Sequence, residues 1–150
     1  MAFWLTANEL GLDTDYAAAG LAWVFECFER GLIDRKDTDG LDLRWGNGEA
    51  LIALMRKVVY REGIGDLLAD GMVEAAKKIG QGSEYYLTQI KGQPSIEPFR
   101  IPKGWALGVC TSPVAGRHLR GATRGPAHSG PRDVDFDITH FRNQAQSVVW

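Results

Sequence analysis

Cysteine is scarce in this chain of 150 residues, which holds only Cys27 and Cys110, far apart in sequence. Small secreted domains stapled by disulfides carry more cysteines, and neither residue belongs to a CxxC pair with metal-ligand spacing. We therefore expect two reduced, buried thiols in a cytoplasmic protein, and no metal site built by the chain alone.

An excess of charge of one sign is also missing, as are long apolar runs. The net charge of −2 argues against nucleic-acid binding, because phosphate-binding proteins usually show a strong basic excess. No apolar run approaches the roughly 18 residues that span a bilayer. The N-terminal MAFWLTANEL has neither the basic region nor the cleavage site of a signal peptide. We expect no nucleic-acid and no membrane partner.

What the chain does have is an ordinary globular composition, with 45% hydrophobic and 24% charged residues. Apolar residues at helical spacing, bounded by capping residues and glycines, predict several helices. These cover residues 2–10, 14–30, 49–61, 66–69, 70–79 and 138–150. A short strand is expected over 85–91, and loops over 31–48 and 112–135. Residues 105–111 fit either a short buried helix or a packed loop. The predicted fold class is mostly α: irregular helical domains with one or two short strands and long loops.

The predicted helix over 14–30 is apolar on nearly all sides, so most of its faces should be buried. A single domain of this size would struggle to cover it, and we expect other domains or a partner there. Asp13 or Thr14 is positioned to cap this helix, and Asn47 to cap the one over 49–61. Both ends of the chain look cut inside structural elements, which is the pattern of a fragment.

Three blocks of sequence carry a family resemblance: 8–13 (NELGLD), 60–71 (YREGIGDLLADG) and 106–120 (ALGVCTSPVAGRHLR). In this order they resemble motifs of the aldehyde ferredoxin oxidoreductases, which are tungsten- or molybdenum-pterin enzymes. The stretch over 121–137 is similar to the branch that includes the tungsten subunit of benzoyl-CoA reductases. The resemblance implies that residues 1–80 correspond to the first helical domain and 81–150 to the start of the second.

In whole members of the family, a bis-pterin tungsten or molybdenum cofactor lies beside a 4Fe–4S cluster. The resemblance places the cysteine ligands of that cluster before Met1 and after Trp150. It implies a fragment of an oxidoreductase that acts on aldehydes or related oxo groups, with ferredoxin as electron partner and the remaining enzyme domains as further partners. Alone, the chain is expected to be inactive and to hold no cofactor tightly.

Asp13 matches the acid that ends the family's pterin-binding motif. The rim of a pterin presents several N–H donors, and a carboxylate accepts two of them at once. Asn8 stands where many relatives have Asp and offers an uncharged acceptor, while Gly11 and Leu12 set and pack the turn. The alternative for Asp13 is a plain helix N-cap, and the two roles do not exclude each other.

His118 matches a histidine that lies close to the metal in relatives, where an imidazole donates a hydrogen bond or shuttles a proton. It is the predicted catalytic residue; the alternative is an ordinary surface or core histidine. Arg117 and Arg120 lie in a basic stretch that also holds Arg124 and Arg132. A guanidinium fork fits pterin phosphates or a carboxylate-bearing substrate. The alternative is a solvated or interdomain loop.

Two further functions stay open on the sequence. One is a helical interaction module derived from this family that binds no cofactor. The other is an anion-binding protein that uses the arginines of 117–132. A module should be monodisperse and unfold cooperatively, whereas a fragment should expose its apolar 14–30 helix and aggregate.

Overall fold

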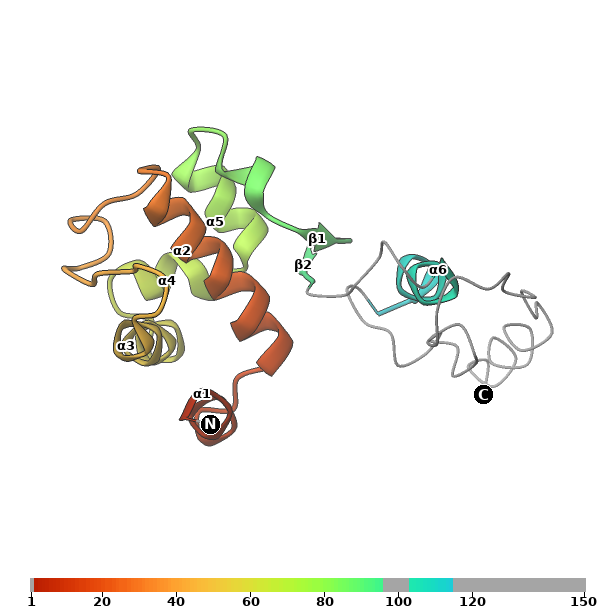
Figure 1. Cartoon of the computed structure of the whole chain (residues 1–150), viewed down its shortest axis with the longest axis horizontal. Coiled ribbons are helices and arrows are strands. Elements are labelled where there is room, and N and C mark those ends of the chain that lie inside the picture. Colours follow the sequence, from red (N-terminus) through yellow and green to blue (C-terminus); the bar gives the residue numbers. More distant parts are fainter. Residues whose placement is uncertain (1, 96–102, 115–150) are drawn as a thin grey trace. The chain divides into compact units, whose positions relative to one another are not determined.

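A computed structural model describes residues 2–95 and 103–114 of the chain (Figure 1). The described part is mostly helical with one two-stranded sheet, which confirms the predicted fold class. Two compact units are present, Met1–Ile96 and Glu97–Trp150. Unit 1 contains α1 (Ala2–Glu9), the π-helix η1 (Tyr16–Gly20), α2 (Leu21–Glu29), α3 (Gly48–Tyr60), α4 (Ile64–Ala69), α5 (Met72–Ile79), the 3₁₀ helix η2 (Ser83–Tyr86), β1 (Gln89–Ile90) and β2 (Gln93–Pro94).

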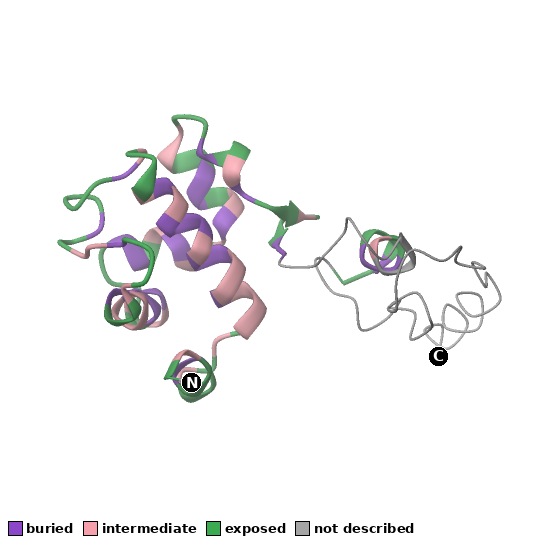
Figure 2. Ribbon diagram, in the orientation of Figure 1, coloured by how far each residue is buried: buried purple, intermediate pink, exposed green. Residues whose placement is uncertain are grey.

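Helix α2 lies at the centre of unit 1, and the buried part of the ribbon concentrates on it and on the helices beside it (Figure 2). It contacts α3 and η2, while α3 also packs against α1 and α4. Its buried residues are Leu21, Trp23, Val24, Phe25 and Cys27. Ala18 and Ala22 of the predicted 14–30 helix are only half-buried and line an apolar hollow, so the expectation that other domains or a partner cover part of this helix stays a prediction. Within the unit, α2 is partly covered by η2 and α3, and its buried side chains belong to the common core.

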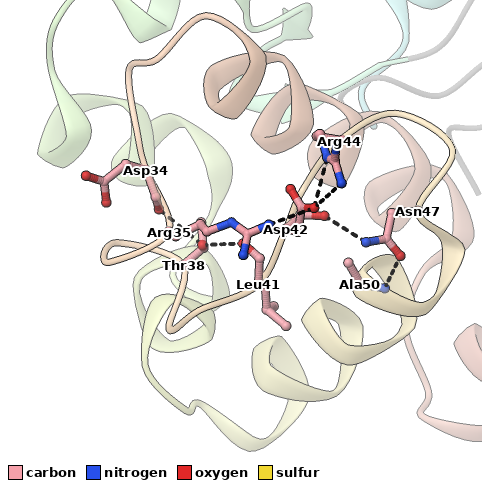
Figure 3. Close-up of polar contacts among 8 residues, drawn as sticks. All are labelled: Asp34, Arg35, Thr38, Leu41, Asp42, Arg44, Asn47 and Ala50. Carbon is pink, nitrogen blue, oxygen red and sulfur yellow. Dashed lines mark hydrogen bonds and ion pairs between the residues drawn. The ribbon is translucent and has the colours of Figure 1, made fainter.

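Asn47 caps α3 as predicted, since its Oδ1 accepts a hydrogen bond of 3.1 Å from the N–H of Ala50. Its Nδ2 donates to the carbonyl of Asp42 and ties the preceding loop to the cap (Figure 3). Inside that loop Thr38 is fully buried, with its hydroxyl 2.8 Å from the carbonyl oxygen of Leu41. The side chains of Arg35 and Arg44 pair with Asp42. The predicted loop is thus well held by its own polar contacts.

The predicted strand over 85–91 is only partly correct. Its first residues belong to η2, and the strand β1 is limited to two residues that pair antiparallel with β2. The cause is a set of bonds around Ser83, which is buried. Its Oγ donates to the carbonyl of Ala76 at 3.0 Å, and its own carbonyl accepts from Trp23 Nε1 at 2.9 Å. These contacts bend the chain into a 3₁₀ turn before it can extend.

The second unit is described only over residues 103–114. There α6 (Lys103–Thr111) forms, which confirms the helical alternative for this stretch. The predicted helix over 138–150 lies outside the described residues. None of the helices in the described part is long and apolar enough to cross a bilayer.

Candidate functional site

The turn after α1 is shaped by Gly11, whose φ is +68°. The N–H of Leu12 donates to the carbonyl of Ala7 at 2.8 Å, and the N–H of Gly11 donates to that of Asn8 at 3.2 Å. This pair of bonds is the Schellman ending of a helix, in which the left-handed position favours glycine. Leu12 is half-buried and packs against the core. Gly11 and Leu12 therefore set and anchor the turn.

Asp13 follows at once and caps the next helix. Its Oδ1 accepts a hydrogen bond of 2.8 Å from the N–H of Tyr16, and its carbonyl accepts one from the N–H of Ala17 at 2.9 Å. The predicted N-cap role is therefore confirmed for Asp13, in preference to Thr14. The residue is exposed, so its carboxylate is held in place at the surface.

Asn8 lies in the last turn of α1 and is also exposed. Its Nδ2 donates to the carbonyl of Trp4 at 2.8 Å. That bond uses an amide hydrogen, and the amide oxygen keeps its capacity to accept. The structure thus brings Asn8, Gly11 and Asp13 to the surface of one short turn between two helices.

Tyr16 is the residue of this region whose importance the sequence pattern did not reveal. It counts as one of many apolar positions in the helix, yet its hydroxyl donates to the carbonyl of Leu68 in α4 at 2.7 Å. Burial raises the pKa of this hydroxyl, which therefore stays a proton donor. The available signal was a phenol in an otherwise apolar run, because a buried tyrosine needs a partner for its hydroxyl.

The distinctive residues of the block over 60–71 contact other residues of unit 1. A Cβ on Gly65 would lie 2.1 Å from the backbone carbon and oxygen of Lys57, so α4 and α3 approach each other at this glycine. Gly63 has φ +52° and ψ −125°, a conformation open to glycine alone, and faces the carboxylate of Asp39. Arg61 pairs with two aspartates of the same block. These contacts hold α3 and α4 together.

Asp39 joins the loop before α3 to the start of α4. Its Oδ2 accepts from the N–H of Ile64 at 2.9 Å and lies 3.2 Å from Lys57 Nζ. The bond from the Ile64 amide, followed by the lysine, lowers the pKa of this carboxyl. The sequence alone places Asp39 in a charged loop and gives no sign of this contact.

Two apolar hollows lie near the start of α3. One, of about 220 Å³, is lined by Phe3, Ala17, Ala18, Ala22, Phe25, Trp45, Gly46, Asn47, Gly48 and Leu51. The other is a wider, open groove of about 670 Å³, lined by Ala2, Phe3, Gly48, Glu49, Leu51, Ile52, Ala53 and Arg56. Nearby, Trp4 and Trp45 are each about half exposed, at 53% and 52%. This face of unit 1 is therefore apolar and accessible.

Metal ligands do not gather in the described part of the chain, where no three His, Cys, Asp or Glu side chains lie close enough to hold an ion. Cys27 is fully buried, and burial, with a smaller effect of Glu26, raises its pKa to about 12. Its thiol is therefore neither a ligand nor a nucleophile near neutral pH. Cys110 is exposed, which corrects the expectation that both thiols are buried. His118, Arg117 and Arg120 lie outside the described residues, and their roles stay predictions.

Comparison with known proteins gives relatives along nearly the whole chain. The tungsten-containing aldehyde ferredoxin oxidoreductase of Pyrococcus horikoshii is 37% identical over 118 residues, which cover 76% of this chain and 19% of that relative. The enzyme of the same name from Pyrococcus furiosus is 34% identical and covers 87% of this chain and 22% of the relative. The chain thus spans about a fifth of the length of these curated relatives.

Other relatives carry different names. The WOR-like subunit of an aliphatic sulfonate oxidoreductase from Pyrococcus furiosus is 38% identical over 102 residues, covering 68% of this chain and 15% of that protein. Among solved structures, the active site complex BamBC of benzoyl coenzyme A reductase, in complex with 1,5 dienoyl-CoA, is similar with a TM-score of 0.58 and 36% identity. That match covers 69% of this chain and 16% of the solved one.

The family profile described as "Aldehyde ferredoxin oxidoreductase, domains 2 & 3" matches residues 2–150. The matched residues include both the exposed turn at 8–13 and the packed block at 60–71. The chain belongs to the aldehyde ferredoxin oxidoreductase family, of which it represents a part of domains 2 and 3.

Proposed function

We propose that this chain supplies part of the wall of the pterin pocket in a tungsten- or molybdenum-pterin oxidoreductase. Asp13 is the principal contact, and Asn8 adds an uncharged acceptor on the other side of the Gly11 turn. The observation that carries the proposal is the exposed carboxylate of Asp13, held by a helix cap at the end of a family-matched block.

The residues present fit a pterin in their chemistry. A pterin edge offers N–H donors, and this turn offers a carboxylate and an amide oxygen, which are acceptors. Gly11 is exposed, and among the described residues no atom beyond its chain neighbours lies within 4 Å of the place a Cβ would take. A flat ring can approach the backbone there. The fit concerns the pterin alone, since no metal ligand set gathers in the described part.

The activity proposed for the whole protein is oxidation of an aldehyde, or a related reaction at an oxo group, with ferredoxin as electron partner. When bound, the metal-pterin cofactor and a 4Fe–4S cluster supply the redox chemistry, and the protein binds and orients. His118 is proposed to move a proton near the reacting group, and Arg117 and Arg120 to meet anionic groups of cofactor or substrate. Because the chain spans about a fifth of its relatives, we propose that it oxidises no aldehyde alone.

The test is a titration of the full chain with free pterin, in which pterin fluorescence reports binding. Asp13→Asn is the informative variant, because asparagine also caps helices but carries no charge. A hydrogen bond to a charged group contributes about 1.5–3 kcal/mol, so affinity should fall about tenfold or more. Glu84→Gln removes one exposed negative charge elsewhere and should leave affinity unchanged. Binding should be weak, because the chain supplies only part of the pocket wall. Equal affinity of Asp13→Asn and the unaltered chain, or no measurable binding by either even at high pterin concentration, contradicts the proposal.

A second candidate function is an interaction module without cofactor. The apolar face formed by the groove beside α3, with Trp4 and Leu5 exposed at 53% and 60%, favours it. Under this function the chain is monodisperse, unfolds cooperatively and binds no pterin. Sedimentation and urea unfolding, measured beside the pterin titration, separate the two functions.

A further inference from the structure

Tyr16 connects the two family-matched blocks of unit 1 through a single residue. Its N–H donates to Asp13 Oδ1 at 2.8 Å, and its hydroxyl donates to the carbonyl of Leu68 at 2.7 Å. Asp13 closes the block over 8–13, and Leu68 lies in α4, within the block over 60–71. One side chain and its own amide therefore join the exposed carboxylate to a helix 52 residues away.

We infer that Tyr16 is a positioning residue, which holds the Asp13 carboxylate in its orientation for the pterin by anchoring the helix start to α4. The inference rests on the proposed function. It gives the block over 60–71 a role as well, because this block fixes the carbonyl to which the helix start is tied.

The anchor point is rigid. Leu68 is fully buried, and its carbonyl also accepts from the N–H of Gly71 at 3.0 Å. Helix α4 is pressed onto the backbone of Lys57 at Gly65, where no side chain separates the two helices. A carbonyl oxygen has two lone pairs, so the Leu68 carbonyl accepts the tyrosine hydroxyl in addition to the N–H of Gly71. The bond therefore has a fixed and favourable target.

The C-terminal end of η1 is also fixed by packing. Tyr16 opens the π-helix η1, which ends at Gly20. A Cβ on Gly20 would lie 2.6 Å from Met72 Cε, so the first residue of α5 fills the space that a side chain would need. The strand β2 also lies against η1. π-Helical turns occur often at functional sites, where they place a side chain that a regular helix would turn away.

The inference is tested with Tyr16→Phe in the full chain, which removes one hydroxyl and keeps the ring. Tyr60→Phe, at a 62% exposed position in α3, is the matched control. We expect amide hydrogen exchange to become several times faster at residues 13–17 in Tyr16→Phe and to stay unchanged across α3. Affinity for free pterin should fall about threefold to tenfold, the range for one neutral hydrogen bond.

A double-mutant cycle distinguishes positioning from general support. If Tyr16 acts through the carboxylate, Tyr16→Phe has a clearly smaller effect on pterin affinity once Asp13→Asn is present. Additive losses overturn the inference, as does unchanged exchange at residues 13–17 or unchanged affinity in the single variant. If the unaltered chain binds no pterin, the proposed function fails. The exchange comparison then still decides whether Tyr16 holds the turn, because faster exchange supports it and unchanged exchange overturns it.

Discussion

The blocks over 8–13 and 60–71 both match the family, but their side chains serve different purposes. In the first, Asn8 and Asp13 are exposed on a turn that the backbone of Gly11 makes possible. In the second, Gly65 allows two helices to approach closely, and Arg61 pairs with Asp66 and Asp70. The second block is the longer and more distinctive sequence motif. A distinctive motif can thus encode a packing arrangement, while a short one leaves polar side chains exposed.

Gly65→Ala should produce the largest loss of stability, because the new Cβ would lie 2.1 Å from backbone atoms of Lys57. Backbone cannot rotate away as a side chain can, so α3 and α4 must separate, at a cost of about 2–3 kcal/mol. Urea unfolding measures this. Gly48→Ala is the control, since nothing lies within 4 Å of its Cβ position. If the two variants are equally stable, the close approach of α3 and α4 is not as described.

Asp13→Ala should destabilise the chain by about 1 kcal/mol through loss of the N-cap. Asp13→Asn should lose much less, because its amide oxygen accepts the same bond from the N–H of Tyr16. Thr14→Ala, at the other residue predicted as a cap, should stay within about 0.5 kcal/mol of the unaltered chain. Urea midpoints at constant slope give all three values. A larger loss of stability in Thr14→Ala than in Asp13→Ala would contradict the assignment of the N-cap to Asp13.

Arg61 separates backbone from side-chain effects inside the second block. Its φ of +54° places a non-glycine residue at the left-handed end of α3, while its guanidinium pairs with Asp66 and Asp70. Arg61→Ala loses the pairs and keeps the unfavourable backbone. Arg61→Gly loses the same pairs but relieves the backbone, so it should be more stable than the alanine variant by about 1 kcal/mol. Thermal unfolding of the two variants side by side measures this difference.

Asp39 should give the smallest effect, visible as a pH dependence. Its pKa is lowered from 3.8 by the N–H of Ile64 and then by Lys57, so the folded state favours the ionised carboxylate. This stabilisation is complete above the ordinary pKa and is lost as the pH falls below it, toward the lowered pKa of the folded state. The side chain is 37% exposed, so solvent screening keeps the effect small.

The measurement compares the unfolding free energy of the unaltered chain and of Asp39→Asn from about pH 6 to about pH 3. Asparagine tolerates the left-handed φ of +55° at this position, so the backbone should not change. The variant should lack part of the acid-induced loss. Glu62→Gln, at another exposed acid, should follow the unaltered chain. Parallel curves for all three proteins would show that Asp39 does not contribute to the pH dependence of the unfolding free energy.

Local patterns predicted the helices and their caps well. Apolar spacing located α1, α3 and α5, and the residues Asn47 and Asp13 carry the capping bonds expected of them. These features depend on neighbours within a few positions, which a sequence displays directly. The exposure of Asp13 on a turn was likewise implied by its place between two helices.

Features that depend on distant partners were not predictable. The π-helix at Tyr16 meets Leu68 and Met72, and the 3₁₀ turn at Ser83 meets Trp23, all far along the chain. The apolar periodicity treats Tyr16 as one more apolar position and cannot show which group its hydroxyl contacts. The partial cover of α2 within its own unit was hidden for the same reason, because α3 and η2 come later in the chain.

The two cysteines of the chain differ in accessibility, and this difference allows the opening of unit 1 to be measured by thiol modification. Cys110 is exposed, so a thiol-specific reagent should modify it readily under native conditions. Cys27 is fully buried in the last turn of α2, and its pKa of about 12 leaves almost no thiolate even where a reagent arrives. Alkylation of Cys27 therefore requires the core to open. Its rate in a Cys110→Ser background would time the opening of unit 1 without any added probe.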